Sequence, residues 1–197
     1  MNCLIVDSST KNLYISIIYD NKLVFEKYIA GKNDHAKNIV ATIDEGLKEN
    51  NMTVDCLDRV VCGIGPGSYT GVRMAVTVCK MISSFKKIDL YTISTLKLIS
   101  SGYSGICKVM IDARRNKAFA MVFDYNKSQY VLKEGLYSYD ELSSYEADFI
   151  VTDDDIKVDA FFCMNNSILC QNPDLLVPNY LRETEAERNL KWLGNYK

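Results

Sequence analysis

The chain has little of what several classes of functional site require. Its 197 residues include one histidine, His35, and seven cysteines of which no two form a C-x-x-C pair. No apolar run approaches the ~20 residues of a membrane helix, and the first residues lack the basic and apolar regions of a secretory leader. Lys and Arg number 23 against 25 for Asp and Glu, and this net charge of −2 gives no general attraction for nucleic acid. We therefore expect a cytoplasmic chain with reduced cysteines and no membrane contact, whose role towards RNA is indirect or shared with a basic partner.

Residues 63–73, GIGPGSYTGVR, form a glycine-rich turn between two apolar stretches. The stretch before the turn, Val60–Cys62, predicts a strand, and Val72–Ile82 after it predicts a helix. Three glycines permit backbone angles closed to other residues and let a second group come close: Gly65, Gly67 and Gly71. Ser68 and Thr70 suit the cap of the following helix. Either a phosphate or a partner protein fits such a turn.

The spacing of this turn excludes three known motifs. A Walker A loop needs four residues between its glycines and then Lys-Ser or Lys-Thr, but five residues separate Gly65 from Gly71 and Val72 follows. The pattern G-x-G-x-x-x-G is one residue longer than the dinucleotide fingerprint. A nucleophile elbow centred on Ser68 needs a glycine two residues to either side, where Pro66 and Thr70 stand.

Two segments of the chain repeat with an offset of 105 residues. Leu4–Asp7 and Val109–Asp112 are each a short apolar strand that ends in Asp. Each is followed by an alternating strand, Leu13–Tyr19 or Ala118–Asp124, and then by a polar turn and a third apolar strand. The repeat predicts two three-stranded meanders, with chance similarity of short strands as the alternative.

Helices and further strands follow each predicted meander. A helix over 35–49, capped by Asn33 or Asp34, has one apolar face at helical spacing: Ala36, Val40, Ile43 and Leu47. The next expected elements are a strand over 59–62, a helix over 72–85, a strand over 90–93 and a Thr95-led helix over 96–101. In the second part, Ser138 and Glu141 form a capping-box pattern that starts a helix, and a strand covers 148–152. Both parts thus have the order βββαβα.

Four segments resemble the motifs of one family, the bacterial TsaB proteins of tRNA threonylcarbamoyladenosine biosynthesis. GPGSYTGVR is similar to that family's GPGS-[FY]-TG-[VIL]-R turn, and IVDSST is similar to its I-D-[ST]-S-T opening. IDARRNKAF (111–119) resembles I-D-A-R-x-x-E-[VI]-[FY], and PNYLRETEAER (178–188) resembles Y-L-R-x-x-x-A-E. The four motifs occur in the family's order and span Leu4 to Arg188.

The resemblance implies an α/β fold of two tandem actin-like (ASKHA, ribonuclease H-like) βββαβα halves, residues 1–102 and 103–197, the second abbreviated. It implies a non-catalytic subunit that binds and activates TsaD, the enzyme that transfers threonylcarbamoyl to a tRNA adenosine beside the anticodon. The ATPase TsaE is expected to join that complex. The resemblance also implies that this chain contacts tRNA only indirectly and that it forms a homodimer when alone. By itself the chain is expected to have no enzymatic activity.

The helix after the glycine turn is apolar on most of its surface. Eight of the eleven residues 72–82 are apolar, and the exceptions Arg73, Thr77 and Lys80 form one narrow stripe. A surface helix of a monomer has a wider polar face, so this helix either lies enclosed within the fold or packs against a partner. In the second case it packs, together with the helix over 35–49, against the equivalent pair of TsaD. The predicted interface residues are His35, Ile39, Ile43, Tyr69, Thr70, Arg73, Met74, Thr77, Val78 and Met81.

A second candidate site lies at the end of the first predicted strand. In actin-like folds an Asp there, followed by Ser or Thr, holds Mg²⁺ or a nucleotide phosphate, and residues 7–10, DSST, have that form. A capped strand-to-turn junction is the alternative. The predicted phosphate-binding residues are Asp7, Ser9, Thr10, Gly65, Gly67 and Ser68. In the second half Asp112 holds the place equivalent to Asp7, but Ala113-Arg114-Arg115 follows it instead of hydroxyl side chains. A symmetric pair of phosphate sites, one in each half, is therefore not favoured. We expect no tightly bound cofactor, with ATP or ADP and Mg²⁺ at the partner interface as the remaining option.

Two classes of enzyme compete with the accessory role. An independent ATPase or small-molecule kinase would use Asp7, the hydroxyls that follow it and the glycine turn. A hydrolase, as in a protease, would pair Ser68 with His35, but Ser68 lacks a nucleophile elbow. The H-x-x-x-H metal site of TsaD cannot be built, because Ile39 stands four residues after His35, and no metal site is predicted.

Overall fold

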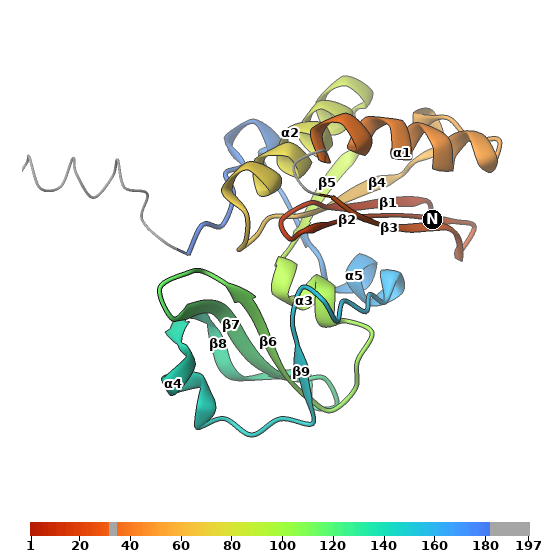
Figure 1. Cartoon of the computed structure of the whole chain (residues 1–197). Helices are drawn as coiled ribbons and strands as arrows, with labels where there is room; N and C mark the ends of the chain where they lie inside the picture. The colour runs from red at the N-terminus through yellow and green to blue at the C-terminus, as the bar shows by residue number, and fades with distance from the viewer. Residues whose placement is uncertain (32–34, 182–197) are drawn as a thin grey trace, which may run out of the picture.

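The computed structural model describes residues 1–31 and 35–181, whose helices and strands are arranged in layers (Figure 1). The first half contains β1 (Cys3–Asp7), β2 (Asn12–Tyr19), β3 (Lys22–Ala30), α1 (His35–Glu49), β4 (Arg59–Gly63), α2 (Tyr69–Lys86), β5 (Asp89–Ile93) and α3 (Thr95–Ser100). The second half contains β6 (Ile106–Asp112), β7 (Lys117–Asp124), β8 (Gln129–Ser138), α4 (Tyr139–Ser143), β9 (Phe149–Val151), α5 (Ala160–Asn166) and β10 (Ile168–Leu169). Two short 3₁₀ helices are η1 (Val54–Cys56) and η2 (Pro173–Leu175).

Each sheet is a meander extended by parallel strands. In the first sheet, of order β10-β5-β4-β1-β2-β3, β1 pairs antiparallel with β2 and parallel with β4. In the second sheet, of order β8-β7-β6-β9, β6 pairs antiparallel with β7 and parallel with β9. β1 and β6 therefore hold equivalent places. The predicted repeat is confirmed, as two ASKHA-like halves of which the second has fewer elements in the part of the chain that the structure describes.

Three apolar cores hold the layers together. α1 and α2 cover one face of the first sheet, where Ile39, Leu47 and Val76 pack with buried residues of β1 and β4 (Figure 1). α3 and α5 lie between the two sheets, and Leu96 belongs to a core to which both sheets contribute. α4 covers the other face of the second sheet through Leu142. Strand β1 is buried along its whole length because helices pack on both faces of its sheet.

The start of α2 differs from the prediction. The helix begins at Tyr69, three residues earlier than expected, because Ser68 is its N-cap and the Ser68 hydroxyl accepts the Gly71 N–H at 3.3 Å. Ser68 is thus confirmed as a cap, whereas Thr70 lies inside the first turn and is not one.

Two other helix starts were predictable from local sequence. The capping box of α4 is confirmed, since the Ser138 N–H donates to Glu141 Oε2 at 2.7 Å and the Glu141 N–H donates to the Ser138 hydroxyl at 3.2 Å. α1 covers the predicted residues 35–49, and its proposed caps Asn33 and Asp34 lie outside the described residues.

Residues 168–181 return to the first half of the molecule. β10 pairs antiparallel with β5, and the Cys170 N–H donates to Leu90 O at 2.8 Å. Farther along, the Asn179 N–H donates to Ile64 O at 2.7 Å, beside the glycine turn. No local pattern in the sequence indicated this return, and the division into residues 1–102 and 103–197 stays a prediction.

All seven cysteines are free, five of them buried and two half-buried. Burial raises the pKa of Cys3 and of Cys163 to about 12, so these thiols are neutral at physiological pH. No helix within residues 1–31 and 35–181 is both long and apolar enough to cross a membrane.

Candidate functional site

The glycine turn lies directly on the loop that follows β1. The Ser68 N–H donates to Ser9 O at 2.7 Å, and the Ser8 hydroxyl donates to Gly71 O at 2.7 Å. A Cβ on Gly67 would lie 2.1 Å from Ser9 O, and a Cβ on Gly71 would lie 2.0 Å from Ser8 O. Both positions require glycine because the two backbones are in contact.

Asp7, at the end of β1, is the centre of a buried hydrogen-bond network. Its carboxylate accepts the Ser9 N–H at 2.8 Å and the Thr95 hydroxyl at 2.5 Å. Thr95 Oγ1 in turn accepts the Gly65 N–H at 3.0 Å, and the Thr95 N–H donates to Gly65 O at 2.9 Å. Asp7 is only 1% exposed. Thr95 therefore ties the end of β1, the glycine turn and the start of α3 together.

The structure brings the predicted phosphate-binding residues together but fills the space among them with protein. Asp7, Ser9 and Thr10 are buried, and the turn residues Gly67 and Ser68 lie against the backbone of Ser9. A phosphate at this place would have to displace the contacts of the turn. The arrangement matches the capped strand-to-turn alternative, while phosphate binding stays a prediction. Within the described residues, no group of three His, Cys, Asp or Glu side chains could hold a metal ion.

Thr95→Val is expected to lower the free energy of unfolding by about 3 kcal/mol. Valine has nearly the shape of threonine, but it cannot donate to Asp7 or accept from Gly65, both of which are buried. Urea unfolding followed by circular dichroism measures the loss. Thr95→Ser keeps the hydroxyl and should retain most of the stability; a loss in Thr95→Ser with none in Thr95→Val would assign the stability to the methyl group instead.

The outer sides of α1 and α2 form a groove of about 390 Å³. Seven of the ten predicted interface residues line it: Ile39, Tyr69, Thr70, Arg73, Met74, Thr77 and Val78. The side chains of Tyr69, Arg73 and Thr77 are exposed, and those of Met74 and Val78 are half-buried. α2 is thus a helix of the surface layer, and the alternative that it lies enclosed within the fold is wrong.

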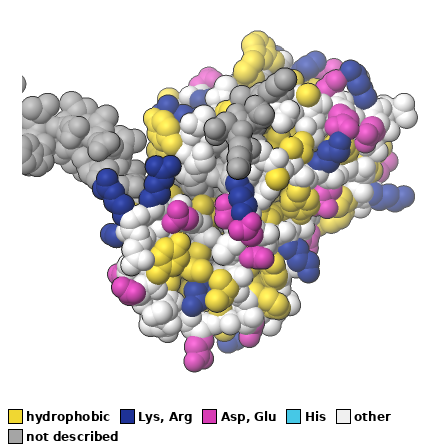
Figure 2. All heavy atoms as spheres, in the orientation of Figure 1, with side chains coloured by type: hydrophobic (Ala, Val, Ile, Leu, Met, Phe, Trp, Pro, Cys, Tyr) yellow, Lys and Arg dark blue, Asp and Glu magenta, His cyan; other side chains and the backbone are white. Residues whose placement is uncertain are grey.

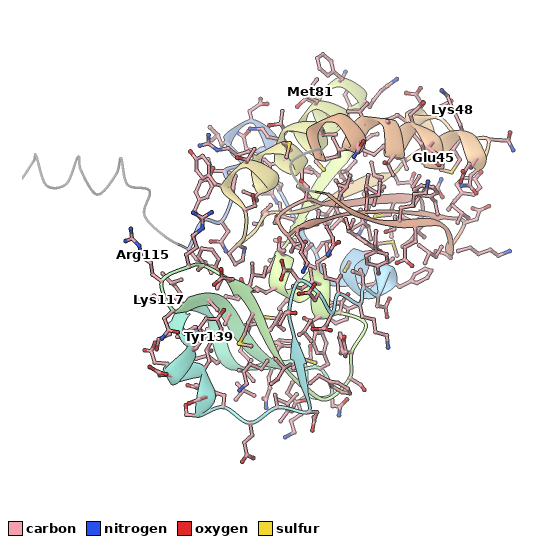
Figure 3. All side chains as sticks on the ribbon, viewed as in Figure 1. Glu45, Lys48, Met81, Arg115, Lys117 and Tyr139 are labelled. Atoms are coloured by element: carbon pink, nitrogen blue, oxygen red, sulfur yellow. The ribbon has the colours of Figure 1, made fainter. Side chains whose placement is uncertain are left out.

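Two of the other predicted interface residues, Ile43 and Met81, lie outside this groove. Ile43 is buried in the core between α1 and the first sheet. Met81 is 53% exposed and lies farther along α2, at the top of the molecule in Figure 3. The side chain of His35 is outside the described part of the chain.

Val40 lines the groove and was not predicted to do so. Its helical spacing with Ile43 and Leu47 placed it on the buried face of α1. In the structure the buried face is formed by Ile39, Ile43 and Leu47, spaced four residues apart, and Val40 is 59% exposed. The signal that could have found it is the pair Ile39-Val40, because adjacent residues point in directions about 100° apart on a helix and Ile39 continues the four-residue spacing of Ile43 and Leu47.

One end of the groove is framed by the returning C-terminal segment. The Arg73 guanidinium lies 4.1 Å from the ring centroid of Tyr69, and Arg73 Nε donates to the Tyr180 hydroxyl at 2.8 Å. The rings of Tyr69 and Tyr180 are 5.2 Å apart. Lys80 Nζ donates to Asp174 O at 2.9 Å. Two of the three polar residues in the stripe on α2 therefore hold the chain's own C-terminal segment.

Comparison with known families identifies the type of protein. The family model of tRNA N6-adenosine threonylcarbamoyltransferase, TsaD, matches residues 28–151, more than half of the chain. The chain belongs to this family. A curated relative, the tRNA threonylcarbamoyladenosine biosynthesis protein TsaB of Bacillus subtilis, is 27% identical over 128 residues, 64% of this chain and 56% of that protein. TsaB of Haemophilus influenzae is 25% identical over 124 residues, 60% of this chain and 52% of that protein. The chain spans about half the length of the curated relatives it matches.

Solved structures show the same fold. YeaZ from Pseudomonas aeruginosa superimposes with a TM-score of 0.75 at 17% identity, over 91% of this chain and 99% of that one. A protein from the same organism, described as similar to the peptidase YeaZ, gives 0.76 at 16% identity, over 92% and 99%. With the family match and the curated relatives, this makes the chain a TsaB/YeaZ-type protein of the actin-like ATPase superfamily, as the motifs implied.

Proposed function

We propose that the chain is a non-catalytic subunit that binds and activates TsaD in tRNA threonylcarbamoyladenosine biosynthesis. The observation that carries the proposal is the groove between α1 and α2, where Val40, Tyr69 and Met74 present apolar surface. The relatives named TsaB and the family model named TsaD support it. Two chains with a common fold can pack equivalent helices against each other, so the same groove also suits a homodimer when TsaD is absent.

The apolar surface of α2 continues beyond the groove. Met74, Val78, Met81 and Phe85 recur at spacings of four, three and four residues, the pattern of a seam between two helices packed side by side. Phe85 is 80% exposed. A stripe of this length on a surface helix suits a helix of a partner protein.

An accessory role also agrees with the composition of the chain. His35 is the only histidine, so the chain by itself cannot supply an H-x-x-x-H metal site. Because Asp7 and Ser9 are taken up by protein contacts, we do not propose an independent ATPase, and we place any ATP or ADP with Mg²⁺ at the interface with TsaD. TsaE would join the assembled complex. The proposal places the chain in the cytoplasm, where tRNA is modified.

The test is light scattering on a sizing column, with the chain alone and mixed with TsaD from its own organism. A 1:1 heterodimer is expected on mixing, and any homodimer of the chain should disappear as the heterodimer forms, because both use one groove. A chain that elutes unchanged in the presence of TsaD would contradict the proposal.

A further inference from the structure

The tip of the β6–β7 hairpin has a strained backbone. Arg114, Arg115 and Asn116 have φ angles of 64°, 55° and 57°, three left-handed residues in succession without a glycine. Asparagine adopts this conformation readily, but arginine does so rarely. In the corresponding turn of the first half, residues 8–11, which the structure describes in full, none has a positive φ. Such conformations cluster at functional sites, so the tip is a candidate for one.

The same tip carries exposed cations. The side chains of Arg114, Arg115 and Lys117 are all exposed. Figure 2 shows Lys and Arg side chains gathered at the left-hand edge of the molecule, and Figure 3 places Arg115 and Lys117 at that edge, at the top of the second half. The motif that the segment resembles has Glu at the position of Lys117, so this chain has a more basic tip than the motif indicates.

Two carboxylates near the tip are bound by the protein itself. Asp112 Oδ1 accepts the Arg114 N–H at 3.2 Å, and Glu141 Oε2 accepts the Ser138 N–H at 2.7 Å. The hydrogen bonds from Ser138, with a smaller contribution from Lys117, lower the pKa of Glu141. Among residues 1–31 and 35–181, neither carboxylate forms an ion pair with Arg114 or Arg115, so these two acids leave both guanidinium groups to other anions.

An aromatic side chain lies beside the β6–β7 tip. Tyr139, the first residue of α4, is 38% exposed, and its N–H donates to Asn116 O at 3.3 Å. Its hydroxyl donates to Asp112 Oδ1 at 3.4 Å. Burial and the nearby Asp112 raise the pKa of Tyr139, which keeps the ring neutral. Figure 3 shows Tyr139 on the same edge of the second half as Lys117.

We infer that the β6–β7 tip and Tyr139 form a contact for single-stranded RNA. Arg114 and Arg115 hold successive phosphates, and the Tyr139 ring stacks on a base; cations beside an exposed ring are the combination by which proteins bind unpaired RNA. The inference rests on the proposed function in one respect, since that function makes the RNA the anticodon loop of a tRNA. The net charge of −2 indicated only an indirect role towards tRNA, but the three cations Arg114, Arg115 and Lys117 are exposed at the tip itself, although Asp112, Asp140 and Glu141 lie near it.

The decisive variant is Arg114→Asn with Arg115→Asn, because asparagine suits the left-handed backbone and removes the guanidinium groups without a change of turn conformation. The matched control is Lys22→Asn with Lys48→Asn, two exposed lysines of the first half; Figure 3 shows Lys48 on the opposite side of the molecule from Arg115. Each variant, in complex with TsaD, is titrated against a labelled anticodon stem-loop by fluorescence anisotropy. The arginine variant should bind roughly tenfold more weakly at low salt, with a slope of log K against log salt smaller by about 1.4. The control should bind like the wild type.

A second pair of variants tests the stacking. Tyr139→Ala should weaken RNA binding about fivefold, whereas Tyr139→Phe, which keeps the ring, should not. Wild-type affinity and salt slope in the arginine variant would overturn the inference. So would loss of TsaD binding by that variant alone, because the tip would then contact an acidic protein surface. If the wild-type chain fails to bind TsaD, the proposed function fails, and the same titrations on the chain alone still decide whether the tip binds RNA.

Discussion

Val40→Glu is expected to weaken the binding of TsaD by the chain roughly a hundredfold, which corresponds to about 3 kcal/mol. In the monomeric chain Val40 is 59% exposed at the edge of the groove between α1 and α2, so a glutamate there is hydrated and the melting temperature, measured at a concentration where the chain is monomeric, should not change. In the heterodimer the carboxylate would be removed from water against an apolar seam without a partner charge. Isothermal titration calorimetry measures the affinity, and thermal unfolding of the chain alone measures the fold.

A matched control for this variant is Val131→Glu. Val131 lies on β8 of the second half and is 47% exposed, so the substitution is chemically the same on a surface of similar exposure away from the groove. Val131→Glu should bind TsaD like the wild type. Equal weakening by the two variants, or no weakening by Val40→Glu, would show that the partner does not use this groove.

The parts of the fold that could be predicted depend on residues close together in the sequence. The capping box of Ser138 and Glu141 spans four residues, and the structure contains both of its hydrogen bonds. The repeat could be recognised because each meander is a continuous segment with short turns. The helix after the glycine turn was identified from its apolar residues, and its start was misplaced because Ser68 caps a turn that contains no apolar repeat.

The parts that could not be predicted depend on residues far apart in the sequence. Thr95 was placed at a helix start, but its hydroxyl bonds Asp7, 88 residues away. Tyr180 contacts Arg73 across 107 residues, and nothing local to either residue indicates the pair. Most residues that line the candidate groove could be predicted, because they lie on two helices whose apolar residues are regularly spaced. The error at Val40 arose because a four-residue apolar pattern fits two neighbouring faces of α1.

Gly71→Ala is expected to destabilise the fold by about 3 kcal/mol, against the direction that helix propensity predicts. Gly71 lies in the first turn of α2, where alanine would be favoured over glycine by about 1 kcal/mol if the helix stood alone. Its Cβ, however, would lie 2.0 Å from Ser8 O and 3.3 Å from Ser68 Cβ. Ser8 cannot move aside, because it is fully buried and its hydroxyl bonds Gly71 O at 2.7 Å. The midpoint of urea unfolding measures the loss.

The control for this prediction is Ser84→Ala, at an exposed position of the same helix. Helix propensity alone should raise its free energy of unfolding by a few tenths of a kcal/mol, at most about 0.5. The two substitutions therefore have opposite expected signs, although both introduce alanine into α2. A Gly71→Ala variant as stable as the wild type would contradict the prediction. It would mean that the loop after β1 moves to accept the methyl group, so that the backbone contact does not require glycine at this position. Since α2 also carries Tyr69, Met74 and Val78, a shift that relieves the clash would move one wall of the groove. A Gly71→Ala chain that still folds should thus bind TsaD more weakly, which connects the glycine turn to the partner surface through the position of a single helix.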